Sequence, residues 1–138
     1  YKEIQGLEPD LVHAQKLITW ADHLVFVYPN WWASFPALLS GFFDRTILPG
    51  FAFNYTGKYT WTKYLKGKTA RLIVTMGGPA LFYRFILGAP GHKVMRASLH
   101  FCGVKPVRST VFGLAADVSA KRAKKMKERV YRVGIRDA

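Results

Sequence analysis

The chain has 138 residues, of which half are hydrophobic and 15% aromatic. This length allows one domain with one core, and the composition excludes an intrinsically disordered chain. The formal net charge of +13 would suit a nucleic-acid-binding protein. However, much of the excess lies in residues 121–136, and no motif that reads a DNA groove is present. We therefore predict no nucleic-acid partner.

No apolar run approaches the ~18 residues that a membrane-spanning helix needs, and the longest candidate, residues 24–43, is interrupted by two prolines and an asparagine. Because the chain opens on polar and charged residues, we expect no signal peptide. The single cysteine, Cys102, cannot form an intramolecular disulfide and sits in an apolar stretch typical of a small core residue. No Cys/His cluster has metal-ligand spacing. These features predict a cytoplasmic protein without a metal.

The first half of the chain predicts a helix, a strand and a second helix. Apolar residues recur at helical spacing over residues 8–21, and Pro9 suits the first helical position. Residues 23–28 form a β-branched and aromatic run, which is typical of an interior parallel strand covered by helices on both faces. Pro36 opens a second helix that runs to about residue 47.

The second half predicts two more strands and two more helices. Residues 50–69 read as an irregular segment rich in aromatic side chains. Strands are expected at residues 71–76 and 107–114, with a helix over residues 91–102 between them that ends at Gly103. A last helix begins near Ser119 and has an apolar stripe opposite a basic face, which is most often simply solvated: Ala123, Met126, Val130 and Val133 against Lys121, Lys124, Lys125, Glu128 and Arg132.

Strands that alternate with helices indicate an open parallel α/β sheet with right-handed crossovers. Ligands bind such sheets at the carboxyl ends of the strands, which here are residues 28–33, 76–83 and 113–117. No glycine-rich or hydroxyl-rich loop that could hold a phosphate is visible. If a nucleotide binds, we expect its phosphate site to lie in residues outside this sequence.

Two of these strand ends carry residues suited to a flat ligand. Trp31 and Trp32 offer stacking surface beside backbone N–H groups, although core or interface packing would explain them equally well. Gly77 and Gly78 allow a ligand to approach the main chain, and Tyr83 adds a hydroxyl donor. An ordinary strand-ending turn followed by a packed aromatic residue is the alternative for this second segment.

Five short stretches follow one another in a specific order: Tyr28-Pro29-Asn30-Trp31-Trp32, Gly41-Phe42-Phe43-Asp44-Arg45, Pro49-Gly50-Phe51-Ala52-Phe53, Thr75-Met76-Gly77-Gly78 and His100-Phe101-Cys102-Gly103. Together they resemble the flavodoxin-like NAD(P)H dehydrogenase (quinone) family over about residues 8–131. The resemblance implies an open parallel sheet in the order 2-1-3-4-5 with helices on both faces. This chain would form a single domain that supplies strands 3, 4 and 5, so we expect the first strand and the phosphate loop to lie in front of Tyr1.

The resemblance also implies a bound flavin, FMN or FAD, that passes hydride from NAD(P)H to quinones or similar small acceptors, in a homodimer. The residues implied to bind the flavin are Pro29, Asn30, Trp31, Trp32, Ala33, Thr75, Met76, Gly77, Gly78 and Tyr83. Among them, Tyr83 matches the catalytic tyrosine that stabilises negative charge on the reduced flavin. Phe53 and Tyr55 match aromatic positions that reach the substrate pocket of a partner subunit.

Two further residues are assigned to the substrate pocket. Arg84 neighbours Tyr83 and is placed to meet a phosphate of the nicotinamide nucleotide. Some family members carry a relay histidine several residues after the tyrosine, where an ungapped count here reaches Ala89. The nearest histidine is His92, which could serve only with a differently shaped loop and which we otherwise expect on the surface at a helix N-terminus.

Two other functions remain open at this point. Some relatives are flavoprotein regulatory subunits of a potassium-efflux transporter, and the basic last helix could then face a membrane or a membrane-protein partner. A single-electron carrier such as flavodoxin is a further alternative, but such carriers present an acidic rim, and the visible charge here is positive.

Overall fold

The computed structural model describes residues 6–137. Its helices are α1 (Pro9–Trp20), α2 (Ala37–Thr46), α3 (Pro90–Cys102) and α4 (Ala120–Asp137), and a π-helical turn, η1, spans Phe82–Ile86. Its strands are β1 (His23–Pro29), β2 (Phe53–Tyr55), β3 (Trp61–Lys63), β4 (Thr69–Thr75) and β5 (Val107–Phe112). No helix in the described part of the chain is both long and apolar enough to cross a membrane.

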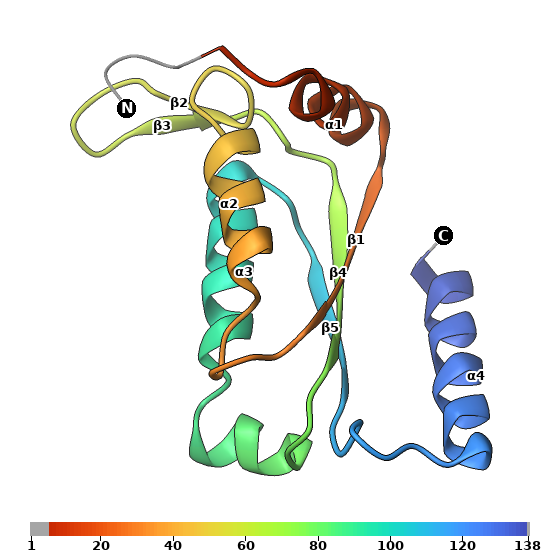
Figure 1. Ribbon diagram of the computed structural model, residues 1–138. Coiled ribbons are helices and arrows are strands. Elements are labelled where there is room, and N and C mark those ends of the chain that lie inside the picture. Colours follow the sequence, from red (N-terminus) through yellow and green to blue (C-terminus); the bar gives the residue numbers. More distant parts are fainter. Residues whose placement is uncertain (1–5, 138) are drawn as a thin grey trace.

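The main sheet is parallel and has the order β1-β4-β5. Val27 of β1 lies opposite Ile73 of β4, which in turn lies opposite Thr110 of β5. Helices α2 and α3 cover one face of this sheet, and α4 lies on the other (Figure 1). This order and these layers are those expected for strands 3, 4 and 5 of a flavodoxin-like sheet, so the predicted fold class is confirmed.

Alternation along β4 sends its side chains to two different surroundings. Leu72 and Val74 enter the core beneath α2 and α3, where both are almost completely buried. Arg71 and Ile73 point to the opposite face and are buried as well. The central position of β4 therefore explains its continuous apolar pattern, as the sequence predicted.

Within residues 6–137, the same prediction does not hold for β1, which is covered on one face only. Leu24 and Tyr28 are buried in the core, but Val25 and Val27 remain 53% and 70% exposed on the opposite face. The physical reason is the position of α4, whose last turn is tied to β4 and β5 and leaves the β1 side of that face uncovered within residues 6–137. An apolar pattern on both faces of a strand shows only that other elements can pack on both faces, and not that they do.

Residues 50–69 are more regular than the sequence indicated, because β2 and β3 form an antiparallel hairpin. Trp61 stacks on Phe101 with ring centroids 4.6 Å apart, and its Nε1 donates a hydrogen bond to the Phe101 carbonyl oxygen at 2.9 Å. Each strand has only three residues, which is too short for a period-two pattern to stand out. The hairpin is held by this aromatic packing against α3.

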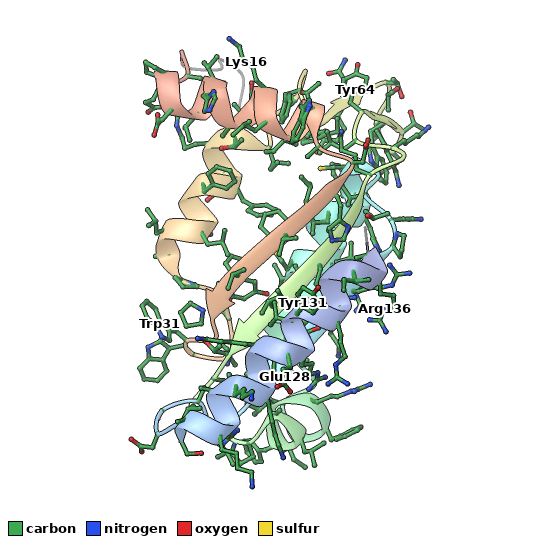
Figure 2. All side chains as sticks on the ribbon, turned by 90° about the vertical axis from the view of Figure 1, so that its right-hand side faces the viewer. Lys16, Trp31, Tyr64, Glu128, Tyr131 and Arg136 are labelled. Atoms are coloured by element: carbon green, nitrogen blue, oxygen red, sulfur yellow. The ribbon has the colours of Figure 1, made fainter. Side chains whose placement is uncertain are left out.

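The apolar stripe of α4 is half-buried against the sheet as predicted, whereas Tyr131 projects into solvent (Figure 2). Its last residue, Asp137, forms a buried ion pair with Arg71, whose Nη1 also donates to Thr110 Oγ1 at 2.7 Å. The hydrogen bond from Arg71 lowers the pKa of Asp137, and the nearby charges of Arg108 and His23 act in the same direction. Polar contacts thus fix the end of α4 to the centre of the sheet.

Candidate functional site

Three loops meet at the carboxyl ends of the parallel strands. The Asn30 N–H donates to the Thr75 carbonyl oxygen at 2.7 Å, which joins the loop after β1 to the end of β4. The N–H groups of Leu114 and Ala115 donate to the carbonyl oxygens of Gly78 and Met76 at 3.0 and 2.9 Å, which joins the loop after β5 to the glycine pair. The predicted flavin-binding segments around Asn30 and Gly78 therefore lie side by side.

The loop after β1 forms a tight turn in which Trp31 and Ser34 exchange two backbone hydrogen bonds of 2.9 and 2.8 Å. The two central residues, Trp32 and Ala33, have φ angles of +51° and +60°. Left-handed backbone is unfavourable for residues with a side chain and costs on the order of 1–3 kcal/mol each. The Trp32 side chain is fully exposed, and Trp31 points away from the sheet beyond the end of β1 (Figure 2). Such strain persists only where surrounding contacts enforce it.

The enforcing contacts converge on the carbonyl oxygen of Ala33. It accepts a hydrogen bond from the Gly91 N–H at 3.0 Å and a longer one from the Tyr83 hydroxyl at 3.5 Å. A Cβ atom at Gly91 would lie 2.9 Å from Ser34 Cα and 3.1 Å from the Tyr83 hydroxyl oxygen. The start of α3 can therefore approach the turn only because residue 91 is glycine.

Tyr83 and His92 lie next to each other beneath the turn at Trp32 and Ala33. Both are buried, their ring centroids lie 5.3 Å apart edge to face, and the His92 N–H donates to the Tyr83 hydroxyl at 3.4 Å. Burial raises the pKa of Tyr83, and burial together with the nearby Arg96 charge lowers the pKa of His92. Near pH 7 the tyrosine is therefore a neutral hydroxyl and the histidine a neutral imidazole.

The expectation that His92 is a surface residue was wrong. The reason is the loop before it, in which the π-helical turn and left-handed backbone at Gly88 and Ala89 turn α3 back toward Tyr83. The ungapped count that reached Ala89 assumed a regular path for this loop. With the actual path, His92 is the histidine that contacts the tyrosine.

Several backbone donors at the strand ends have no partner among residues 6–137: the N–H groups of Trp32, Ala33, Gly77 and Gly78. A Cβ atom at either Gly77 or Gly78 would meet no atom within 4 Å, so open space adjoins both. Free donors beside open space suit the polar edge of a flat heteroaromatic ring, and Trp32 adds stacking area. These residues fit a flavin ring.

Tyr83, Arg84 and His92 line one cavity of about 590 Å³. Its walls come from η1, the first turns of α3, residues Ser109 and Val111 of β5, and Arg129 of α4. Because α3 and α4 lie on opposite faces of the sheet, a cavity lined by both sits at the outer edge of β5. We call it the β5-edge cavity.

Phe53 and Tyr55 do not join this group within one chain. They pack on Phe101, with centroids 4.8 and 6.4 Å from its ring, and line a separate, mainly apolar cavity of about 510 Å³ between β2, α2 and α3. The β2–β3 hairpin lies at the opposite end of the sheet from the strand ends that carry Trp31 (Figures 1 and 2). Their assignment to a partner subunit's pocket stays a prediction.

The family model of the flavodoxin-like fold matches residues 2–133. The chain belongs to this flavodoxin-like family. Its parallel β1-β4-β5 sheet, with helices on both faces, agrees with that membership.

Two curated relatives of this flavodoxin-like chain are named as quinone dehydrogenases. Ribosyldihydronicotinamide dehydrogenase (quinone) of Mus musculus is 37% identical over 136 residues, which are 91% of this chain and 55% of the relative. NAD(P)H dehydrogenase (quinone) 1 of Cavia porcellus is 37% identical over 109 residues, 75% of this chain and 38% of the relative. The chain thus spans about half or less of the length of these relatives.

Solved structures show the same architecture. Smu.1420 of Streptococcus mutans has a TM-score of 0.80 at 31% identity and covers 91% of this chain and 66% of its own. General stress protein 14 of Treponema denticola, solved in complex with FMN, has a TM-score of 0.64 at 28% identity and covers 91% of this chain and 69% of its own.

Sequence reasoning missed the residues that pack against the candidate site or line the adjoining cavity. Gly91 follows Pro90 at a helix start, a signal that could have indicated a close backbone approach. Arg96 and Arg129 reach the β5-edge cavity from two helices that are neighbours only in the folded chain, so no sequence signal could have placed them together.

Proposed function

We propose that the protein containing this chain is a flavin-dependent oxidoreductase that passes hydride from a reduced nicotinamide compound through bound flavin to a quinone-like acceptor. The observation that carries the proposal is the strained turn at Trp32 and Ala33, held beside the open space at Gly77 and Gly78. Strained backbone concentrates at functional sites. The names of the two curated relatives support the reaction class, and the FMN complex supports FMN as the flavin.

In this proposal each residue has a stated task. The free N–H groups of Trp32, Ala33, Gly77 and Gly78 donate to the polar edge of the ring, and Trp32 limits solvent access to it. The flavin supplies the hydride chemistry when it is bound. The neutral Tyr83 hydroxyl can turn its proton toward negative charge that develops beside it, which is electrostatic stabilisation by a fixed donor.

We also propose the cytoplasm as the location and a homodimer as the assembly, in which Phe53 and Tyr55 would complete a partner's pocket. NAD(P)H is the reductant named for one relative and ribosyldihydronicotinamide the reductant named for the other. Neither relative is named as a transporter subunit, so the regulatory alternative gains no support from them.

The test is the absorption spectrum of the protein purified in its full natural length. We expect a yellow flavin spectrum that NADPH bleaches without oxygen and that a soluble benzoquinone restores. A colourless protein that takes up neither FMN nor FAD would overturn the proposal.

A substitution can test whether the flavin ring lies beside Gly78. Gly78→Val should reduce flavin occupancy at least about tenfold, because the new side chain enters open space without meeting protein atoms. Gly134→Val, at an equally open position on α4, is the matched control and should retain the flavin. Equal flavin content in the two variants would place the ring elsewhere.

A further inference from the structure

The β5-edge cavity has an unusual balance of charge. Three arginines and one lysine line it, namely Arg84, Arg96, Arg129 and Lys93, and within the described residues no acidic side chain does. None of these four cations forms an ion pair with an acidic residue in the described range. The other described arginines of the sheet region, Arg71 and Arg108, both pair with Asp137.

Two buried polar atoms at this cavity lack partners. His92 is 9% exposed and lines the cavity, yet its Nε2 has no hydrogen-bond partner. The Ser109 hydroxyl, on the β5 wall, is equally unpartnered. Buried polar groups without partners destabilise a fold unless something else satisfies them. A ligand with several acceptor oxygens would satisfy both.

The charge at the cavity comes from side chains and not from the start of α3 alone. The first N–H groups of that helix are already used: Gly91 donates to Ala33, His92 to Tyr83 and Lys93 to Ala89. The guanidinium groups of Arg84 and Arg129 rest on the rings of Phe85 and Phe112, at 5.4 and 5.5 Å from the centroids, which restricts where they can point. Planar guanidinium groups match the geometry of phosphate oxygens.

We propose that the β5-edge cavity binds a phosphate or diphosphate group, with Arg84, Arg96, Arg129 and Lys93 as its counter-charges and with His92 and Ser109 as neutral hydrogen-bond partners. The volume of about 590 Å³ is within the range of small-ligand pockets. Since Tyr83 lines the same cavity, two sources of this chemistry are possible: the phosphates of a dinucleotide reductant at the flavin site, which rests on the proposed function, or a separate phosphorylated ligand.

The experiment measures binding of inorganic pyrophosphate to the purified full-length protein by isothermal titration calorimetry at fixed ionic strength. We expect saturable binding of one pyrophosphate per chain. Arg96→Glu and Arg129→Glu should each weaken it at least tenfold. Arg132→Glu makes the same change of charge on an exposed residue of α4 that does not line the cavity, and it should weaken binding less than twofold.

Two arms then identify the source. If pyrophosphate raises the apparent KM for NADPH but not for unphosphorylated dihydronicotinamide riboside, the dinucleotide supplies the phosphate. If it affects neither KM, the cavity holds a separate phosphorylated ligand. Absence of saturable binding, or an equal loss in Arg129→Glu and Arg132→Glu, overturns the site. Calorimetry requires no turnover, so the two proposals can fail separately. If the protein takes up neither FMN nor FAD but still binds pyrophosphate, the proposed function is contradicted and the phosphate site is retained.

Discussion

At the scale of single residues, the candidate site depends on hydrogen bonds to a backbone carbonyl oxygen that has no part in the proposed reaction. The Ala33 carbonyl oxygen receives hydrogen bonds from Gly91 and Tyr83, and these fix a turn that is unfavourable for its own residues. Removing either donor would free the turn to relax toward ordinary backbone angles. The free N–H groups of Trp32 and Ala33 would then lose their direction, although neither residue had changed.

Gly91→Ala tests this dependence. Its new Cβ atom would overlap Ser34 Cα, which is backbone and cannot move as a flexible side chain could. We expect a loss of about 1–3 kcal/mol in the free energy of unfolding, measured by urea denaturation, with reduced flavin content. Gly41→Ala, inside α2 with open space around it, is the control and should gain about 0.5–1 kcal/mol. A neutral effect of Gly91→Ala would show that the turn and α3 are not packed as described.

At the scale of elements, α4 is attached mainly through its end. Its apolar stripe is only half-buried, and none of its residues other than Asp137 has a deeply buried side chain. A carboxylate at the last turn of a helix opposes the helix dipole, so the ion pair with Arg71 must account for its place there. Arg71 itself stands at the start of an otherwise apolar run, and it is buried at 3% exposure.

Asp137→Ala should destabilise the fold by about 3–5 kcal/mol, because it leaves the Arg71 guanidinium buried without a counter-charge. The double replacement Arg71→Met with Asp137→Ala should recover part of this loss, and Asp44→Ala, at an exposed carboxylate, should change little.

The pKa of Asp137 is lowered in the folded state from 3.8, so the stability that this carboxylate contributes is present above that pH and is lost as pH falls through the folded pKa. Acid titration of the unfolding free energy should therefore be shallower in the alanine variant.

The elements also show how far the sequence could be read. The three parallel strands and four long helices were predictable, because their apolar spacing and their proline and glycine boundaries are local signals. The contact of His92 with Tyr83 was not predictable, since it depends on left-handed backbone at Gly88 and Ala89 that no periodicity reveals. The exposed face of β1 was not predictable either, because the position of α4 is set by the long-range contact of Asp137 with Arg71.

At the scale of the whole molecule, the two faces of the sheet differ in how they meet solvent. The face under α2 and α3 holds the core. On the other face, Val25 and Val27 are exposed, and β1 has no second neighbouring strand within residues 6–137. An apolar strand with an unpaired edge can pair with another chain. The net charge of +13 opposes such association, but salt screens it over about 10 Å at 0.1 M.

The 138-residue chain expressed alone should therefore associate, and more strongly as the salt concentration rises. The double replacement Val25→Lys with Val27→Lys should suppress this association. Burial of an exposed valine is worth on the order of 1.5 kcal/mol, so losing both sites and adding two like charges should raise the concentration needed for association at least about tenfold, as measured by light scattering. Val94→Lys removes a valine of similar exposure, 52%, from α3, away from the strand edge. If it suppressed association as strongly as the double change, general charge repulsion and not the β1 surface would be responsible.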